Sequence, residues 1–333
     1  MMNMDLPLIS AFFAAFALSL YVMLDGFDLG VGALLLVQPE EQLRDRMVDS
    51  IMPIWDGNET WLIMAGVALL AGFPTAYGIL LPAFYLPLIV MLLALGLRGV
   101  SFEFRYQANL RRPAWDLAFA LGSIIVALMQ GLIVGGLIQG VTVDDDRFSG
   151  SVLDVFRPFT FLTAAAVLIG YIVLGAGWLH LKTTAALRTF AERTLRVVTP
   201  VFVGLAAAAC IAAAFVQPGM LEAWAARYPQ LVLIVALFLL VAVMLMRTIG
   251  GRSDLRPFAL GLALFVLGLV GLAFAIFPGI VPFRLSLWAA SSATSSHVFL
   301  LVGAVIVTPI VLGYSAFAYW VFRGKVPEEG WQG

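Results

Sequence analysis

Two acidic residues interrupt a long apolar segment near the start of the chain. The segment Leu24–Gly32 reads LDGFDLGVG, and its two acids, Asp25 and Asp28, are spaced so that a helix places them on one face. A carboxylate at membrane depth costs about 3 kcal/mol or more, so it needs a partner or a function. Gly26 and Gly30 have the GxxxG spacing that lets a neighbouring helix approach closely. Two interpretations stay open for the acids: structural groups anchored by a basic or backbone partner, or groups that handle protons.

A second polar group stands at the start of a later apolar segment. The segment Ile54–Trp61 reads IWDGNETW. One interpretation is a helix cap, with Asp56 as the capping residue and Glu59 three positions later, as in a capping box. The other is a proton entrance, in which both carboxyl groups lie at the same membrane face as Asp25 and Asp28.

A basic residue is available to balance these acids. Arg98 opens the segment Arg98–Arg105, which reads RGVSFEFR and is followed by Asp116 at the start of the next apolar run. The preference for positive charge on the cytoplasmic side explains most arginines of this region. Arg98 is the best candidate counter-charge, so we expect Asp25 and Asp28 to face protein and to contact a basic or hydrogen-bonding partner, Arg98 above all.

The sequence offers few groups that could hold a metal or haem. His180 and His297 are its two histidines, and neither has an evident histidine partner, whereas haem in a membrane bundle is usually held by paired histidines on facing helices. Cys210 is the single cysteine, so it forms no disulfide within the chain. The sequence has no phosphate loop, CxxC or HExxH motif. We therefore expect that side chains of this chain ligate no haem and no other metal.

Transmembrane helices must position these residues. Of the 333 residues, 62% are hydrophobic and 12% are charged, about half the charged share of a soluble domain. The net charge of −1 gives no indication of a nucleic-acid partner. Apolar runs of about 20 residues predict an all-α integral membrane protein with about nine transmembrane helices in the lipid bilayer. The predicted spans are Leu8–Val37, Asn58–Phe73, Ala76–Leu97, Trp115–Gly140, Phe159–Leu181, Val197–Val216, Leu231–Met246, Phe258–Phe277 and Val298–Phe322.

Two of these spans have special features, and charge gives all nine an orientation. The second span could begin upstream near Ile51, and Pro82 and Pro87 predict a kink in the third. With the N-terminus outside, 15 of the 19 basic residues fall in cytoplasmic segments, among them Arg111. This asymmetry predicts an external N-terminus and a cytoplasmic C-terminus.

A faint internal repeat suggests how the helices are grouped. The tetrapeptide Tyr21–Leu24 in the first span is echoed by Tyr171–Leu174 in the fifth. A parallel repeat of this kind predicts two pseudo-symmetric four-helix bundles, residues 1–140 and 141–277, with residues 278–333 forming a ninth helix and a cytoplasmic tail. Chance similarity between apolar helices is the alternative.

Taken together, the motifs resemble a known family. The resemblance rests on Asp25–Gly32, Trp55–Trp61, Arg98–Arg105, Phe277-Pro278 with Ser286–Trp288, and Tyr319-Trp320 before Arg323–Lys325. These segments look like subunit II of cytochrome bd-type terminal oxidases, and the short loops resemble the cyanide-insensitive branch of that family.

The resemblance implies a bacterial cytoplasmic-membrane enzyme that oxidises quinol and reduces O2 to water. In such enzymes subunit I carries the quinol site and three haems, two b-type and one d-type or b-type. Subunit II is its partner, which supports the haem region and supplies a cytoplasmic proton path. The family also allows for a small accessory membrane subunit and for a quinone bound in subunit II, although no quinone motif is evident in this sequence.

The resemblance also assigns roles to individual residues. Asp56 matches the carboxylate of the proton path, which would continue through Glu59, Asp25 and Asp28. Asp28 also belongs with a second set that matches positions tied to the integrity of the haem region, namely Asp28, Arg98, Asp116 and Trp55.

A proton-coupled secondary transporter is the alternative from a different class. Intramembrane acids and a parallel repeat occur in such transporters too. A transporter works alone or as a homo-oligomer, whereas an oxidase subunit needs a haem-bearing partner. A third interpretation is a purely structural subunit, in which Asp56 and Asp28 do not matter for turnover.

Overall fold

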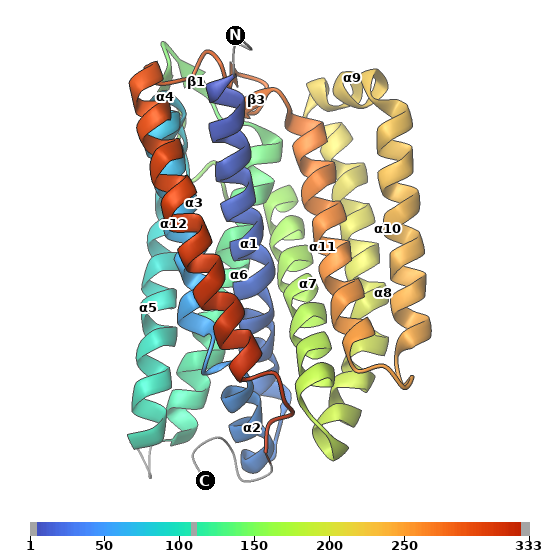
Figure 1. Ribbon diagram of the computed structural model, residues 1–333. Coiled ribbons are helices and arrows are strands. Elements are labelled where there is room, and N and C mark those ends of the chain that lie inside the picture. Colours follow the sequence, from blue (N-terminus) through green and yellow to red (C-terminus); the bar gives the residue numbers. More distant parts are fainter. Residues whose placement is uncertain (1–4, 108–111, 328–333) are drawn as a thin grey trace.

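A computed structural model describes residues 5–107 and 112–327 of the chain. These residues form a helical protein with only two short two-stranded ribbons, β1–β2 and β3–β4 (Figure 1). The helices are α1 (Leu6–Leu34), the 3-10 turn η1 (Leu35–Val37), α2 (Glu41–Ile51), α3 (Trp55–Gly72), α4 (Pro74–Ala83), α5 (Tyr85–Gln107), α6 (Arg112–Gln139), α7 (Pro158–Lys182), α8 (Ala185–Val216), α9 (Pro218–Ala226), α10 (Tyr228–Thr248), α11 (Leu255–Ile276) and α12 (Thr294–Val321). The strands are β1 (Val143–Asp144), β2 (Arg147–Phe148), β3 (Gly279–Val281) and β4 (Leu285–Ser286).

The long helices run side by side, and the start of α1 and the end of α12 lie at opposite ends of the bundle (Figure 1). Within the described residues, eight helices are long and apolar enough to cross a bilayer: α1, α5, α6, α7, α8, α10, α11 and α12. α3 has 18 residues and packs along α1, so it is the ninth long helix of the bundle, although its first turns are polar. The prediction of an all-α membrane protein with about nine transmembrane helices is confirmed.

The third predicted span is broken rather than kinked. α4 ends at Ala83, and α5 begins at Tyr85 after Phe84 leaves helical geometry. Pro87 lacks the N–H that would bond to the carbonyl of Ala83, and its ring crowds that carbonyl. Pro82 lies inside α4 itself.

Two charged segments that looked like loops are helical. α2 lies at the end of the bundle where the chain also ends (Figure 1), and it buries Met47, Val48 and Ile51. α8 begins at Ala185, twelve residues before the predicted start at Val197. Arg111, counted above with the cytoplasmic basic residues, lies outside the described residues.

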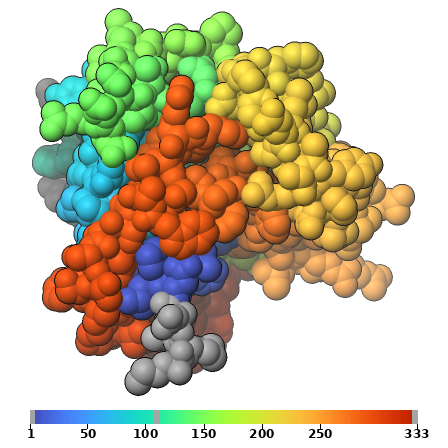
Figure 2. All heavy atoms as spheres, turned by 90° about the horizontal axis from the view of Figure 1, so that it is seen from above, coloured from blue at the N-terminus to red at the C-terminus, as the bar shows by residue number. Residues whose placement is uncertain are grey.

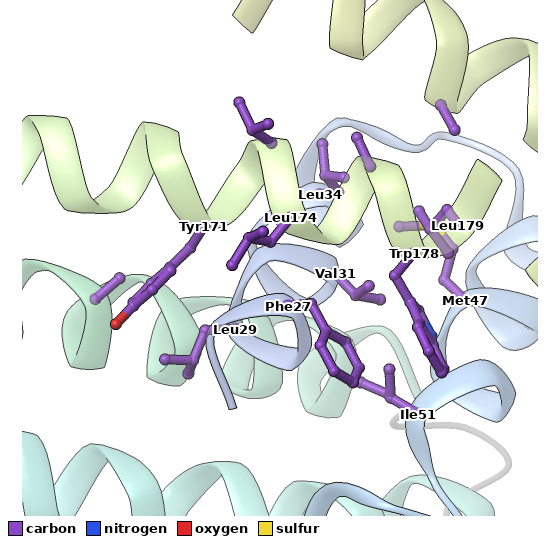
Figure 3. Packing of buried hydrophobic residues seen from close by; sticks show 14 of the residues in the cluster. Phe27, Leu29, Val31, Leu34, Met47, Ile51, Tyr171, Leu174, Trp178 and Leu179 are labelled. Carbon is purple, nitrogen blue, oxygen red and sulfur yellow. The ribbon is translucent and has the colours of Figure 1, made fainter. Parts of the chain in front are cut away.

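The backbones of α1 and α7 touch at the centre of the core. A Cβ built on Gly30 would lie 1.8 Å from the carbonyl oxygen of Tyr171, and one built on Gly175 would lie 2.4 Å from the carbonyl carbon of Gly30. The rings of Phe27 and Trp178 stack across the same interface with centroids 4.4 Å apart (Figure 3). Glycine is therefore required at this contact for its lack of a side chain.

The two repeated tyrosines meet at one residue. Gln130 of α6 donates to the Tyr21 hydroxyl over 2.8 Å, and its amide oxygen accepts from the Tyr171 hydroxyl. Tyr21 lies on α1 and Tyr171 on α7, so the echoed tetrapeptides face a common partner in the bundle.

The end of the bundle that carries the N-terminus is covered by connecting segments. Viewed from above (Figure 2), residues 277–293 lie across its middle, between α9 and the segment around β1 and β2. The backbone N–H of Ser292 donates to the Gly72 carbonyl over 2.9 Å, and the Trp288 indole donates to Asp5 over 2.9 Å. These bonds join the cover to the adjacent ends of α3 and α1.

Candidate proton-handling site

A cluster of ionisable side chains is buried between α1, α3 and α5. The Nη2 atom of Arg98 lies 2.6 Å from Oδ1 of Asp25 and also donates to the Glu59 carboxylate. The side chains of Arg98, Asp25 and Glu59 are 0%, 1% and 24% exposed. We name Asp25, Asp28, Glu59 and Arg98 the carboxyl cluster. Arg98 is thus the partner of Asp25 that charge balance predicted.

A glycine on the neighbouring helix helps to place Arg98 inside. A Cβ built on Gly122 of α6 would lie 3.0 Å from the Ala94 carbonyl oxygen and 3.5 Å from the Arg98 Cβ atom. α5 and α6 are therefore in close contact one helical turn before Arg98 and at Arg98 itself. That contact holds the arginine on the side of α5 that faces the acids.

Asp28 has a different partner from Asp25. Its Oδ2 atom accepts from the Asn58 side-chain amide of α3 over 2.7 Å. The Asn58 carbonyl oxygen in turn accepts from the Tyr319 hydroxyl of α12 over 3.0 Å. Asp28 is buried, and among the described residues its Oδ1 atom has no hydrogen-bond partner. The expectation that both acids face protein is confirmed, but Asn58 rather than Arg98 binds Asp28.

Neither Asn58 nor Tyr319 is among the residues that the sequence predicts for the site. Asn58 lies inside the motif Trp55–Trp61, and this position could have indicated that it belongs to the site. Tyr319 belongs to the aromatic residues near the end of the last helix, which are typical of a membrane interface. Only the packing of α12 against α1 and α3 shows that the tyrosine points into the protein.

Asp56 does not cap α3. The capping position is Ile54, and no side chain bonds to the free N–H groups there, so the capping-box interpretation is wrong. Asp56 is exposed in the first turn of α3, and Glu59 follows one turn later on the same side. An exposed carboxyl group thus precedes a partly buried one.

The other two residues assigned to the haem region occupy different surroundings. The Trp55 ring stacks on Phe102 at 4.8 Å and lies 5.9 Å from the Arg98 guanidinium carbon, so it borders the carboxyl cluster. Asp116 instead accepts from Arg105 over 2.5 Å and from Arg44 over 2.8 Å.

These contacts make Asp116 part of a second ion-pair network. Asp45 of α2 lies 2.5 Å from Arg105 and 2.8 Å from Arg112, so the network joins α2 to the adjoining ends of α5 and α6.

The chemical capacity of the carboxyl cluster follows from its composition. Three carboxyl groups surround one guanidinium in a largely buried space, which leaves an excess of negative charge if all are ionised. Buried carboxyl groups avoid such a charge by taking up a proton. Carboxyl groups can bind and release protons, whereas no group of three or more His, Cys, Asp and Glu suited to a metal ion occurs in the described part of the chain.

Comparison with known proteins identifies the family. The family model described as cytochrome bd terminal oxidase subunit II matches residues 6–322. The chain belongs to this family. It is 30% identical to the cytochrome bd ubiquinol oxidase subunit 2 of Bacillus subtilis, with 92% of each chain covered. It is 28% identical to the cytochrome bd-I ubiquinol oxidase subunit 2 of Escherichia coli, with 93% of this chain and 92% of that protein covered.

A solved structure shares the fold. The bd oxidase structure from Geobacillus thermodenitrificans contains a chain that superposes with a TM-score of 0.78 over 96% of this chain and 99% of that one. At 14% identity this likeness shows the fold alone.

Membership makes this chain a multi-pass subunit of a bacterial quinol oxidase complex of the cytochrome bd type. It implies a partner, subunit I, that carries the haems. The transporter alternative is therefore set aside.

The two histidines of subunit II lie in separate surroundings. The two ring nitrogens of His297 lie 2.8 Å from the Ser10 hydroxyl and 2.7 Å from the Ser291 hydroxyl. His180 is buried, with Nδ1 3.5 Å from Glu192 and Nε2 3.4 Å from Arg188. Neither ring faces a second histidine, so this donor set does not fit a haem. That subunit II ligates no haem stays a prediction.

Proposed function

We propose that this subunit supplies protons from the cytoplasmic side to the O2-reducing site of subunit I, and that it supports the haem region of that partner. The observation that carries the proposal is the decrease in exposure along a series of carboxyl groups. Asp56 is exposed, Glu59 is 24% exposed, and Asp25 and Asp28 are buried.

The spacing of these acids supports the proposal. Asp56 and Glu59 are three residues apart on α3, which puts their Cβ atoms about 5–6 Å from each other. Glu59 and Asp25 then share the Nη2 atom of Arg98. Side chains at such separations exchange protons directly or through bridging water. Arg98 keeps the inner acids near one another and is itself always charged.

The reaction of the complex requires a supply of protons. Reduction of one O2 to two water molecules consumes four electrons and four protons. Quinol supplies the electrons in subunit I, which we expect to hold three haems. If the protons come from the cytoplasm while quinol releases its own outside, charge crosses the membrane without a pump. The part of subunit II is to bind and pass on protons at Asp56, Glu59, Asp25 and Asp28.

The second part of the proposal is structural support. Arg98 and Trp55 join α3 to α5, and Asn58 joins α3 to Asp28 on α1. Asp116 joins α6 to α2 and α5. We propose that these contacts fix the surface that subunit I packs against, and that the chain divides into two pseudo-symmetric bundles, 1–140 and 141–277, which meet at the contact between α1 and α7.

The direction of the path depends on orientation. We propose an external N-terminus and a cytoplasmic C-terminus, supported by the asymmetry of basic residues. Reporter fusions after Gly150, in the segment between α6 and α7, and after Gly324, beyond α12, should report outside and inside respectively. Two fusions that report the same side would contradict the topology.

The test of the path is the Asp56→Asn variant in the assembled complex. Asparagine keeps the size and polarity of aspartate but cannot take up and pass on a proton. We expect quinol-driven O2 consumption to fall about a hundredfold, the lower end of the range for loss of one proton-transfer group, with haem content and assembly unchanged.

A matched control separates the path from a general charge effect. Glu103 is an exposed carboxylate on α5, at the same end of the bundle as Asp56. Glu103→Gln removes one negative charge there without touching the series, so turnover should be retained. Wild-type turnover in a fully assembled Asp56→Asn complex would remove Asp56 from the path, whereas loss of haem would show only a supporting role.

A further inference from the structure

We propose that Asp28 is the proton store of the path, a neutral carboxylic acid at rest that Asn58 and Tyr319 hold in position. This inference rests on the proposed proton path and adds to it a resting state and two positioning residues. The observation behind it is that the carboxyl cluster has three acids but a single cation, Arg98.

Arg98 forms ion pairs with two of the three acids and none with the third. Its Nη2 atom contacts Asp25 and Glu59, and no ion pair is found for Asp28 among the described residues. Glu59 has the Arg98 guanidinium to balance its charge and is 24% exposed, whereas Asp28 is fully buried and accepts only from a neutral amide. An ionised carboxylate that is buried and unpaired takes up a proton instead of remaining charged. Asp28 is the acid of the cluster to which this applies.

The hydrogen bonds around Asp28 fit a neutral acid. The Nδ2 atom of Asn58 points toward α1, at 2.7 Å from Oδ2 of Asp28 and 3.4 Å from the Leu24 carbonyl oxygen. The amide oxygen of Asn58 faces the other way and accepts from the Tyr319 hydroxyl over 3.0 Å. This arrangement makes Oδ2 of Asp28 the acceptor and leaves Oδ1 as the oxygen that carries the proton.

Tyr319 fixes which way the Asn58 amide points. If the amide were turned over, its oxygen would oppose the Leu24 carbonyl oxygen, which can only accept, and the bond from the Tyr319 hydroxyl to the amide oxygen would be lost. The Tyr319 hydroxyl lies on the other side of the amide from Asp28, where it donates to the amide oxygen of Asn58. The last transmembrane helix, α12, thereby sets the orientation of an acid on the first.

Turnover then moves one proton without any net change in Asp28. The neutral acid releases its Oδ1 proton to an acceptor deeper in the complex and becomes a carboxylate. A proton from the Glu59 side, which water can reach, restores the acid. One proton enters and one leaves, and no electron is transferred.

The resting charge of Asp28 can be read directly by solid-state carbon-13 NMR. The assembled oxidase is prepared in lipid at pH 7 with aspartate labelled at its side-chain carboxyl carbon, because neutral and ionised carboxyl groups resonate at different shifts. The resonance that Asp28→Asn removes should lie at the neutral position. The resonance that Asp25→Asn removes should lie at the ionised position, since Arg98 pairs with Asp25.

The positioning role is tested with Tyr319→Phe, which deletes a single hydroxyl. We expect the Asp28 resonance to move and turnover to fall severalfold while haem content is unchanged. Tyr314→Phe is the matched control on the same helix, because Tyr314 is exposed, and it should change neither. An unmoved resonance in Tyr319→Phe would overturn the role of Tyr319.

The outcomes separate this inference from the proton path itself. An ionised Asp28 at pH 7 would overturn the inference and leave the path through Asp56 standing. Wild-type turnover in Asp56→Asn would contradict the path, whatever the charge of Asp28.

Discussion

The contact between α1 and α7 gives the sharpest prediction about stability. In Gly30→Ala the new methyl carbon would lie 1.8 Å from the Tyr171 carbonyl oxygen, whereas ordinary contact begins at 3.4 Å. The two helices must therefore separate by up to the difference, 1.6 Å, or bend. The three nearest atoms, the carbonyl oxygen and carbon of Tyr171 and the amide nitrogen of Gly175, are all backbone, so no side chain can turn aside. Overpacking of this kind costs about 1–3 kcal/mol, and the upper part of that range is expected here.

The separation would also disturb contacts on either side of Gly30. The stacking of Phe27 on Trp178 and the bonds of Gln130 to Tyr21 and Tyr171 span the same interface. We therefore expect the complex to unfold at lower temperature and to lose its haem spectrum earlier on heating, because the core that supports subunit I loosens.

Thermal and detergent unfolding of the purified complex, followed by circular dichroism and haem absorption, measure the effect. Gly66→Ala in α3 is the control, since nothing lies within 4 Å of a Cβ built there. It should be neutral or stabilising by up to about 1 kcal/mol, because alanine favours helix over glycine. If Gly30→Ala unfolded like Gly66→Ala, the close contact of α1 with α7 would be refuted.

Two further predictions concern charges at the inner end of the bundle. Arg98→Met removes the cation from two buried or partly buried acids, so it should destabilise the complex by about 3–5 kcal/mol in denaturant unfolding. Adding Asp25→Asn should restore part of that stability. A cost below about 1 kcal/mol would contradict the pairing. A hydrogen bond and the positive charge of Lys325 hold the pKa of Asp254, in the loop before α11, below its usual range. Because the pKa is lowered on folding, the contact stabilises the tail above the pKa of the unfolded chain, about 3.9, and is lost as pH falls through the folded value. A spin label at Gly324 should therefore become mobile on acidification, and in Asp254→Asn it should be mobile already at neutral pH.

Most transmembrane helices were predictable because one property defines them. An apolar run long enough to cross a bilayer has few alternatives to a helix, since every backbone polar group must be satisfied within the segment. α6, α7, α10, α11 and α12 accordingly begin and end within about four residues of their predicted bounds. α2 was missed because its charges are typical of a loop in water. Its charges pair with arginines of α5 and α6, and its apolar side is buried.

The partners of the acids were predictable only in part. Arg98 could be chosen for Asp25 because buried charge requires opposite charge. Asn58 and Tyr319 are neutral, so charge balance gave no reason to select them. The hydrogen bond between them joins positions 261 residues apart, and no local pattern indicates a contact at that separation.

The sequence by itself determined that the protein lies in a lipid bilayer, that it has about nine transmembrane helices, which family it resembles, and which side chains have carboxyl groups able to carry protons. Hydropathy and residue type act locally, so they can be read without knowing what packs against what. Tertiary structure decided which acid receives the guanidinium, which receives the amide, and which stays at the surface. Helical spacing places Asp25 and Asp28 on one face of α1, but only the packing of α3, α5 and α12 around that face gives each carboxyl group its own partner.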